Sequence, residues 1–363
     1  MRCEWKKVKI SDVCKICYGK DHKQLLDGNV PAYGSGGIIR RVNKSIHEKK
    51  SVLIPRKGSL DNLFFADPPF WTVDTLFWTD IDETKINPAF FFYQLKTLDL
   101  ASKNVGTAVP SLTTSVLNDI EINLPSMNIQ KQIAAILSAL DEKIAINRAI
   151  NENLERQAQA LFKSWFVDFD SVSKLGFTES ELGDIPYGWR IYTLSEFLPV
   201  KTGKKNANVS SDKGAYPFFS CSQDFSWTDE YSFEGHAILV AGNGDFNVKW
   251  YNGKFEAYQR TYVLIPYVER YTDWLYYAVK YNLESITSAA RGSVIKFITK
   301  GNLENFAFAA PENLEKCEII DIFSSINRII DALTQENYRL AEIRDSLLPK
   351  LMAGEIDASA VQL

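Results

Sequence analysis

Residues 133–165, IAAILSALDEKIAINRAINENLERQAQALFKSW, carry mostly apolar side chains at alternating steps of three and four residues, and residues 319–351 carry a second series of the same kind. The positions of the first series are Ile133, Ile136, Leu140, Ile144, Asn147, Asn151, Leu154, Ala158, Leu161 and Trp165. Those of the second are Ile319, Ile322, Ile326, Ile330, Leu333, Asn337, Leu340, Arg344, Leu347 and Leu351. Such a heptad seam is typical of a coiled coil. We therefore expect two helices of about 38 residues, each about 57 Å long.

Two arrangements of these helices are consistent with the seam. They can pair antiparallel with each other, which suits a tandem repeat, or each can pack on its own domain. Asn151 and Asn337 occupy equivalent seam positions. A buried Asn there would fix the register of a coiled coil; in the alternative, both side chains face solvent or a partner protein.

The helices are the ends of a longer repeat, at an offset of 184 to 186 residues. Matching residues are Trp5 and Trp189, Ser11 and Ser195, Gly19 and Gly203, Lys20 and Lys204, Pro31 and Pro217, Gly58 and Gly244, Gly106 and Gly292, Thr113 and Thr299, Leu117 and Leu303, and Pro125 and Pro311. Each half thus holds a globular part followed by a helix.

We predict an α+β fold, with two mixed α/β domains separated by a long antiparallel two-helix coiled coil and related by a pseudo-twofold internal repeat. The expected segments are a first domain at 1–126, a central helix at 127–170, a second domain at 171–311 with a linker at 171–188, and a C-terminal helix and tail at 312–363.

Local patterns predict some elements within the domains. The expected strands are Ser51–Pro55, Thr72–Thr79, Ala237–Ala241 and Tyr258–Pro266, and the expected helices are Pro88–Thr97 and Thr272–Tyr281. The expected turns are Gly34–Gly37, Gly242–Gly244 and a hairpin turn at Asn252–Phe255.

The composition is that of a globular protein. Of 363 residues 45% are hydrophobic, and no run of about 18 apolar residues suggests a membrane span. The first residues, MRCEWKKVKI, lack the apolar core of a signal peptide. We expect a cytoplasmic protein that does not contact a membrane.

The charge is unevenly distributed. A net charge of −4 argues against a nucleic-acid binder. Residues 1–125, however, hold 17 Lys and Arg against 14 Asp and Glu, whereas residues 312–363 hold 5 against 10. The acidic C-terminal segment therefore favours contact with protein over contact with phosphates.

Motifs for metal binding or catalysis are weak. Cys14 and Cys17 form a CxxC pair, but no second pair completes a zinc site, and the second half of the chain has Leu198 and Lys201 at the matching places. Asp67-Pro68-Pro69-Phe70 resembles the tetrapeptide of amino-methyltransferases, in which the aromatic residue stacks on a flipped base. Each globular part is too small for a methyltransferase fold, and no P-loop, GxSxG or HExxH pattern occurs. We therefore predict no catalytic residue and no metal or cofactor in this chain.

Polar and basic residues in loops are the candidates for reading DNA, since such side chains bond base edges and phosphates. In the first half they are Lys20, Lys23, Ser35, Arg40, Arg41, Arg56, Lys57, Lys103, Asn104, Thr107 and Ser111. In the second half they are Lys204, Lys205, Ser222, Gln223, Asn243, Asn247, Lys249, Arg291, Ser293 and Lys296. The loops at 106–107 and 292–293 are the strongest candidates, because both are polar and occupy matching places. Framework residues match while loop chemistry differs, as expected for two domains that read different sequences.

Four segments resemble the specificity subunits of type I restriction–modification systems. QIAAILSALDEKI at 132–144 and LFKSWFVDF at 161–169 resemble the central region of that family. LGDIPYGW at 182–189 resembles the start of its second target-recognition domain, and SLLPKLMAGEI at 346–356 resembles its C-terminal signature.

The resemblance implies two target-recognition domains that each read one half of a bipartite, asymmetric site on double-stranded DNA. It implies that the helices set the spacing and dock two modification subunits and, through them, restriction subunits. S-adenosylmethionine, ATP and Mg²⁺ would then belong to those partners, and the chain would have no activity of its own. Two rival hypotheses are a small adenine methyltransferase that uses Asp67–Phe70 and a purely structural coiled-coil adaptor.

Overall fold

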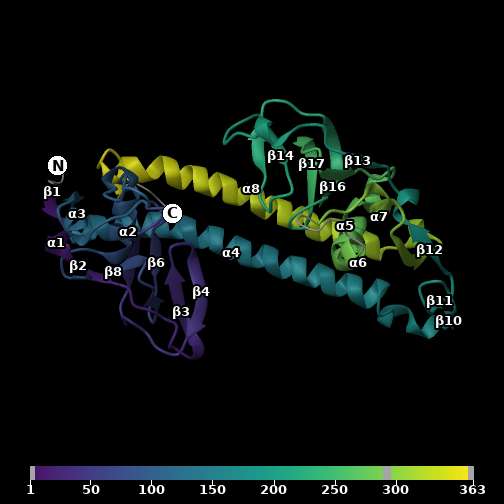
Figure 1. Ribbon diagram of the computed structural model, residues 1–363, viewed down its shortest axis with the longest axis horizontal. Helices are drawn as coiled ribbons and strands as arrows, with labels where there is room; N and C mark the ends of the chain where they lie inside the picture. Colours follow the sequence, from purple (N-terminus) through teal and green to yellow (C-terminus); the bar gives the residue numbers. More distant parts are fainter. Residues whose placement is uncertain (1–4, 289–295, 359–363) are drawn as a thin grey trace. The chain divides into compact units, whose positions relative to one another are not determined.

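The computed structural model describes residues 5–288 and 296–358 and is drawn in Figure 1. Its contacts divide the chain into two compact units. The first unit comprises Met1–Ile146 and Glu336–Leu363, and the second comprises Asn147–Gln335. Each unit therefore combines one globular part with a portion of both long helices, α4 (Met127–Phe166) and α8 (Ile319–Met352).

The globular part of the first unit contains three small sheets with strand orders β1-β9, β2-β8-β5-β6 and β4-β3-β7. The strands are β1 (Lys6–Lys9), β2 (Cys14–Tyr18), β3 (Asp27–Gly34), β4 (Gly37–Val42), β5 (Ser51–Pro55), β6 (Phe64–Ala66), β7 (Trp71–Thr72), β8 (Leu76–Ile81) and β9 (Glu121–Leu124). The α-helices are α1 (Ile10–Val13), α2 (Pro88–Lys96) and α3 (Thr114–Asn118). The predicted strand Ser51–Pro55 is confirmed as β5, and all five of its residues are buried.

The predicted helix at Pro88–Thr97 is confirmed as α2, and its ends follow from its sequence. The Asn87 side chain accepts a hydrogen bond from the Phe90 N–H at 3.0 Å, as expected of an N-cap. Pro88 stands at the first helical position, where a missing N–H costs nothing. Residues 90–95 are all buried, so α2 is a core helix.

The globular part of the second unit contains sheets with strand orders β10-β11, β12-β19 and β13-β18-β16-β17-β14-β15. The strands are β10 (Phe177–Thr178), β11 (Ile185–Pro186), β12 (Trp189–Thr193), β13 (Val200–Thr202), β14 (Tyr216–Phe219), β15 (Ser226–Thr228), β16 (Phe233–Ala241), β17 (Val248–Ala257), β18 (Thr261–Leu264) and β19 (Ala307–Pro311). The α-helices are α5 (Thr272–Tyr281), α6 (Leu283–Ser288) and α7 (Lys300–Glu304). The helix predicted at Thr272–Tyr281 is confirmed as α5, with the same bounds.

Four predicted elements differ from the structure. The strand expected at Ala237–Ala241 is longer, because β16 begins at Phe233. The strand expected at Thr72–Thr79 is broken between β7 and β8 by a turn that the Leu76 N–H closes on the Val73 carbonyl at 3.1 Å. The strand expected at Tyr258–Pro266 is shorter, because the Thr261 N–H closes a turn on the Tyr258 carbonyl at 2.8 Å and β18 spans only Thr261–Leu264. The hairpin turn expected at Asn252–Phe255 is wrong, since these residues lie inside β17, where Gly253 pairs with Gly235 of β16.

The internal repeat is visible in the backbone hydrogen bonds. The Ile10 N–H donates to the Ile120 carbonyl at 3.0 Å, and the Leu194 N–H donates to the Phe306 carbonyl at 2.9 Å. Strands β1 and β9 pair antiparallel, as do the equivalent β12 and β19. The two halves of the chain therefore share backbone contacts as well as matching residues.

The two long helices pack together antiparallel within each unit. In the first unit, Arg344 of α8 pairs with Asp141 of α4 at 2.5 Å. In the second unit, the Asn151 Nδ2 of α4 donates to Thr334 Oγ1 at 3.1 Å and to the Ile330 carbonyl at 3.3 Å. Asn151 therefore faces the partner helix and is half-buried. Packing on the domains also occurs, since Ile133 joins the core of the first unit and Phe323 that of the second.

The seam prediction is wrong at one position. Ile322 is 45% exposed, whereas the next residue, Phe323, is fully buried. The first turns of α8 pack against α5 as well as α4. The buried face of α8 is therefore directed partly toward the domain there, and not only toward α4. Among the described residues, no helix combines the length and apolar character that a membrane crossing requires.

Candidate nucleic-acid interface

Two equivalent loop junctions bring many of the predicted DNA-reading residues together. In the first unit, Lys57 bridges to Ser111, and the Gly58 N–H donates to the Pro110 carbonyl at 3.0 Å. In the second unit, Asn243 bridges to Phe297 at matching positions, and the Gly244 N–H donates to the Lys296 carbonyl at 3.2 Å. We call these the first and second junctions: residues 56–58 with 104–111, and residues 242–244 with 296–298.

The first junction carries basic side chains beside an exposed aromatic ring. The Arg56 guanidinium lies 5.4 Å from the centre of the Tyr18 ring, and its Nη1 donates to the Asp74 carbonyl at 3.1 Å. Lys57 is exposed, and Tyr18 is 53% exposed. Sequence reasoning missed Tyr18; the signal would have been an aromatic residue at the end of a strand, just before the candidate Lys20. An exposed ring and two cations suit contact with phosphates or bases.

Asn104 shapes this loop through its side chain. Its Oδ1 accepts the Gly106 N–H at 2.7 Å and the Ser111 N–H at 2.8 Å. A Cβ at residue 106 would lie 2.1 Å from the Val109 carbonyl oxygen, so only glycine fits there. Thr107 and Lys103 are exposed on the same loop. Asn104 therefore positions neighbouring groups and has little acceptor capacity left for a base.

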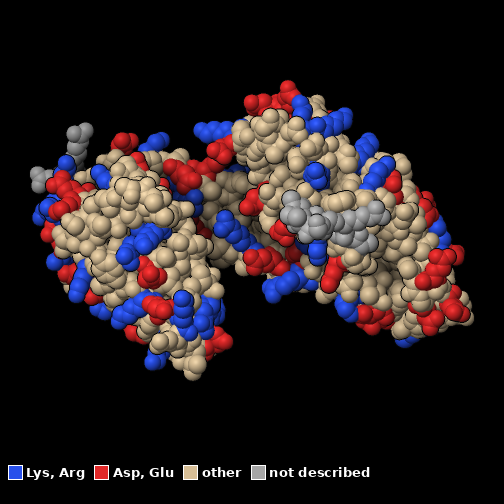
Figure 2. All heavy atoms as spheres, viewed as in Figure 1, with Lys and Arg blue, Asp and Glu red and all other residues tan. Residues whose placement is uncertain are grey.

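The remaining candidates of the first unit lie elsewhere on its surface. Lys20 is exposed after β2, and Ser35 lies in the β3–β4 turn, where its carbonyl accepts from Asn62 at 2.8 Å. On β4, Arg40 is already paired with Asp27 at 2.6 Å, whereas Arg41 is exposed. Figure 2 shows lysine and arginine side chains near β3 and β4 interspersed with acidic ones. Lys23, which precedes β3, is also exposed.

The second junction has a different chemistry. Asn243 and Lys296 lie at the junction itself. The Gln223 Nε2 donates to Oδ2 of Asp245, the residue that follows Gly244, at 2.7 Å. Asn247 is buried and donates to the Cys221 carbonyl at 2.9 Å. Arg291 and Ser293 lie outside the described residues.

The other candidates of the second unit serve partly as structural groups. The Lys249 ammonium donates to the Ser220 carbonyl at 3.4 Å and also to the Ser222 carbonyl, so it holds the loop on which Ser222 is exposed. Burial lowers the pKa of Lys249. Lys205 pairs with Glu230 at 2.6 Å, and Lys204 is exposed.

The motif that suggested a methyltransferase is built into the fold. Phe70 is fully buried against Leu53 and Leu76 and cannot stack on a flipped base without leaving the core. Asp67 is exposed and lies 3.7 Å from Lys50. These two residues therefore do not form a base-binding pocket.

The CxxC pair is likewise structural. Cys14 is buried in β2, and burial raises the pKa of its thiol to about 12, so it remains protonated at neutral pH. Cys14 and Cys17 are both free. No group of three or more potential metal ligands occurs within residues 5–288 and 296–358.

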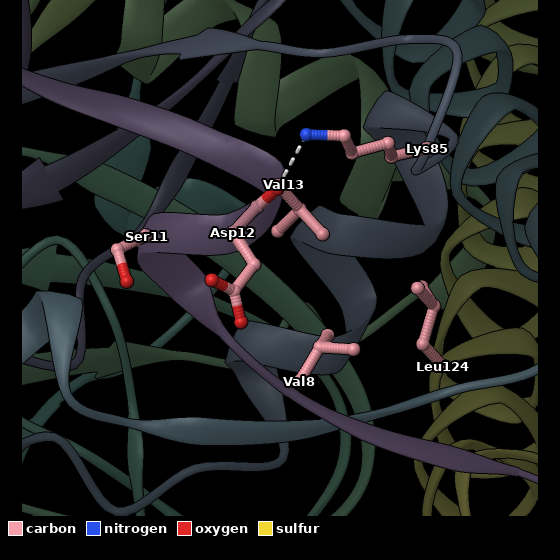
Figure 3. Close-up of a pocket in the computed structure, with 6 residues that line it drawn as sticks. All are labelled: Val8, Ser11, Asp12, Val13, Lys85 and Leu124. Carbon is pink, nitrogen blue, oxygen red and sulfur yellow. Dashed lines mark hydrogen bonds between the residues drawn. The ribbon is translucent and has the colours of Figure 1, made fainter.

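A cavity of about 630 Å³ in the first unit is lined by Val8, Ser11, Asp12, Val13, Lys85 and Leu124 (Figure 3). Its charged groups, Asp12 and Lys85, already have partners within the protein. Lys85 Nζ donates to the Asp12 carbonyl at 3.0 Å, and the Asp12 carboxylate accepts the Lys9 N–H at 2.9 Å as a helix cap. Glu196 caps Thr193 in the same way in the second unit, at 2.8 Å. The cavity therefore belongs to the repeated scaffold.

The two globular parts share a scaffold, and the side chains at their junctions differ. A family model described as the type I restriction modification DNA specificity domain matches residues 3–156 and 186–342. The chain belongs to this family. Membership identifies it as a specificity component rather than a catalytic one.

Individual relatives agree with this assignment. The chain is 35% identical over 178 residues to the EcoDI specificity subunit of Escherichia coli, a match that covers 48% of the chain and 40% of that protein. It is 23% identical to the MjaIX specificity subunit of Methanocaldococcus jannaschii over 97% of the chain and 94% of that protein. The fold is similar to a crystal structure of a type I restriction–modification S subunit from M. genitalium, with a TM-score of 0.66, 20% identity and 96% of each chain covered.

Proposed function

We propose that this chain reads a bipartite, asymmetric site on double-stranded DNA, one half with each globular domain. The observation that carries the proposal is the pair of equivalent junctions with different side chains. Arg56 and Lys57 stand where the second unit has Gly242 and Asn243, while the hydrogen bonds around them match. A shared scaffold with exchanged contact groups suits two domains that read different sequences.

The proposed contact residues are those predicted from the sequence, with Tyr18 added. In the first unit, Arg56, Lys57, Thr107 and Ser111 are the central ones, flanked by Lys20, Ser35, Arg40 and Lys103. In the second, Asn243, Lys296, Ser222 and Gln223 are central, with Lys204, Lys205, Arg291 and Ser293 in support. Asn104 and Asn247 act by holding the loops in shape.

We further propose that the helices set the gap between half-sites and dock two modification subunits, which in turn bring restriction subunits. Ile146 and Ile150 on α4, and Ile329 and Ile343 on α8, are 40–56% exposed. Ile146 and Ile150 lie one helical turn apart, so they expose neighbouring apolar side chains that a partner protein could cover. S-adenosylmethionine, ATP and Mg²⁺ would serve those partners, and action on DNA would place the complex in the cytoplasm.

Paired substitutions in the assembled complex test the two-domain assignment. Arg56→Ala with Lys57→Ala should weaken discrimination at one half-site only, and Asn243→Ala with Lys296→Ala at the other only. A lost bidentate base contact costs about 1–3 kcal/mol, or roughly 5- to 150-fold in the rate at a mismatched site. Equal losses at both half-sites for either pair would contradict the assignment, and an absence of any sequence preference in the wild-type complex would favour a structural adaptor.

A further inference from the structure

In each unit, one buried helix of the domain packs against the two long helices. A tyrosine is the sixth residue of this buried helix in both units. Tyr93 is the sixth residue of α2, and Tyr277 is the sixth residue of α5. Both are almost completely buried, with 3% and 0% of their surface exposed. A buried hydroxyl normally needs a hydrogen-bond partner, and each tyrosine finds it on a long helix.

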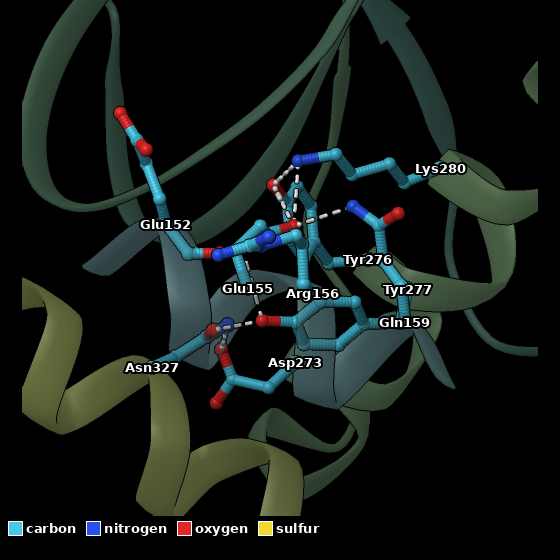
Figure 4. Close-up of polar contacts among 9 residues, drawn as sticks. All are labelled: Glu152, Glu155, Arg156, Gln159, Asp273, Tyr276, Tyr277, Lys280 and Asn327. Carbon is cyan, nitrogen blue, oxygen red and sulfur yellow. Dashed lines mark hydrogen bonds and ion pairs between the residues drawn. The ribbon is translucent and has the colours of Figure 1, made fainter. Parts of the chain in front are cut away.

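In the second unit, the Tyr277 hydroxyl lies 2.8 Å from Asn327 Oδ1 of α8 and 3.3 Å from Glu155 Oε2 of α4 (Figure 4). Asn327 is 1% exposed, and its Nδ2 donates to Asp273 Oδ1 of α5 at 2.6 Å. Asn327 therefore accepts from one residue of α5 and donates to another. Its amide group carries an acceptor oxygen and a donor nitrogen, so one side chain satisfies both residues of α5.

Glu155 adds a second link between α5 and the helix pair. Lys280 Nζ donates to Glu155 Oε1 at 2.6 Å, and the Tyr276 hydroxyl lies 3.4 Å from the same oxygen (Figure 4). Helix α5 is thus tied by directional bonds to both α4 and α8.

The first unit repeats the contact with other chemistry. The Tyr93 hydroxyl donates to Asp141 Oδ2 of α4 at 2.7 Å, and Asp141 Oδ1 accepts from Arg344 Nη1 of α8 at 2.5 Å. Asp141 and Asn327 are equivalent at the offset of 186 residues. The Asp141 carboxylate accepts a hydrogen bond from Arg344 of α8, whereas the Asn327 amide donates one to Asp273 of α5.

These bonds differ in kind from the apolar packing around them. Apolar contact is non-directional and tolerates small rotations, whereas a hydrogen bond of 2.7–2.8 Å weakens steeply when its angle changes. Apolar contact therefore defines the tilt of a domain on the helices less sharply than these bonds do. A shift of about 3.4 Å at the DNA corresponds to one base pair.

We infer that Tyr93 with Asp141 and Arg344, and Tyr277 with Asn327 and Glu155, are positioning residues that fix the angle of each domain on the helix pair and thereby set the gap at which both half-sites are read. The inference rests on the proposed function, because a gap has meaning only if two half-sites are read. The two clusters are built differently and cannot be exchanged, so each domain is held by its own set of partners.

The test uses the complete complex with modification subunits and a series of DNA duplexes. Each duplex carries both half-sites, with the gap varied from two base pairs shorter to two longer than the native one. Adenine methylation is measured for each gap. Tyr277→Phe and Tyr93→Phe remove one hydroxyl each and should raise methylation at gaps one base pair off, relative to the native gap, by about fivefold, the change expected for one hydrogen bond.

Two further variants sharpen the test. Asn327→Asp places a carboxylate against Asp273 and should broaden the gap profile at least as much as Tyr277→Phe. Tyr192→Phe is the matched control, since the Tyr192 hydroxyl donates to the Pro311 carbonyl at 3.0 Å and to neither long helix. It should lower the thermal unfolding midpoint and leave the gap profile unchanged.

The outcomes separate the inference from the proposed function. Unchanged gap profiles for both phenylalanine variants, with stability lost as in Tyr192→Phe, would overturn the inference while two-site reading stands. A wild-type complex without a bipartite preference would overturn the proposed function itself. If Asn327→Asp does not fold, the two phenylalanine variants decide alone.

Discussion

Single polar side chains hold several junctions between elements of this protein. Arg270, just before α5, donates to both oxygens of Asp321 at 2.7 and 2.9 Å and to the Glu315 carbonyl at 2.9 Å. It also donates to the carbonyls of Leu314 and Cys317, at 3.3 and 3.2 Å. One guanidinium thus ties the start of α5 to the start of α8, and its fixed fork of donors suits several acceptors at once.

The Arg270–Asp321 pair predicts a small dependence of stability on pH. Hydrogen bonds from Arg270 hold the pKa of Asp321 below its usual range. The ionised carboxyl therefore stabilises the fold above the unfolded-state pKa of about 4, and this contribution is lost as pH falls through the lowered folded-state pKa. Solvent screens the pair, because the Asp321 side chain is 54% exposed.

Arg270→Gln should therefore flatten the loss of thermal stability between about pH 5 and pH 3. It should also lower stability at neutral pH by about 1–2 kcal/mol, because several backbone carbonyls lose their donor. Unfolding midpoints measured across this range check both effects, with Arg339→Gln on the exposed side of α8 as the control. Curves that run parallel for Arg270→Gln and wild type would rule out the pH contribution.

The start of α8 shows how an element acquires its buried face from its neighbours. Phe323 packs against Phe162 of α4 and Tyr277 of α5, with ring centres 6.3 and 5.2 Å apart. Phe323→Ala should cost about 3–5 kcal/mol of unfolding free energy. Ile322→Ala, one residue away, should cost about 1 kcal/mol or less, because Ile322 is 45% exposed. Denaturant unfolding of the two variants compares them directly, and similar costs would mean that the buried face is misassigned.

The sequence predicts elements where periodicity is long and end signals are clear. Helices α4 and α8 follow from their heptads, and α2 follows from Asn87-Pro88 before a run of aromatic residues. Ile322 was misplaced because a heptad does not say which other elements share a helix surface. Asn252–Phe255 was misread as a turn because Asn-Gly normally favours one, whereas here two glycines face each other across β16 and β17.

The candidate site was predictable only in part. Matching loops could be found from the repeat, and the backbone bonds of the two junctions agree with that alignment. The sequence could not show that Asn104 and Asn247 are consumed by their own loops, or that Arg40 is paired with Asp27, because these are contacts between distant residues. The sequence does not predict the clusters around Tyr93 and Tyr277 either, because their members are also far apart in the chain.

At the scale of the whole molecule, the helices should act as a ruler. Deleting one heptad from each, residues 144–150 and 331–337, keeps the seam in phase and shortens each helix by about 10 Å. We expect the gap between half-sites to shrink by about three base pairs, at about 3.4 Å per base pair, with both half-sites unchanged. Methylation of the gap-series duplexes measures this change. An unaltered gap would show that the helices do not set the spacing.

The chain repeats its scaffold but not the side chains at its two junctions, and from this we expect an asymmetric recognition site. Matching scaffolds give each domain the same way of presenting its loops, and differing junctions give each its own chemistry. The most direct measurement is to co-express the chain with its modification subunit and map the methylated adenines along a genome. We expect one asymmetric motif with two different half-sites and a fixed gap. A single continuous motif, a palindrome or methylation without sequence preference would contradict the assignment of one half-site to each domain.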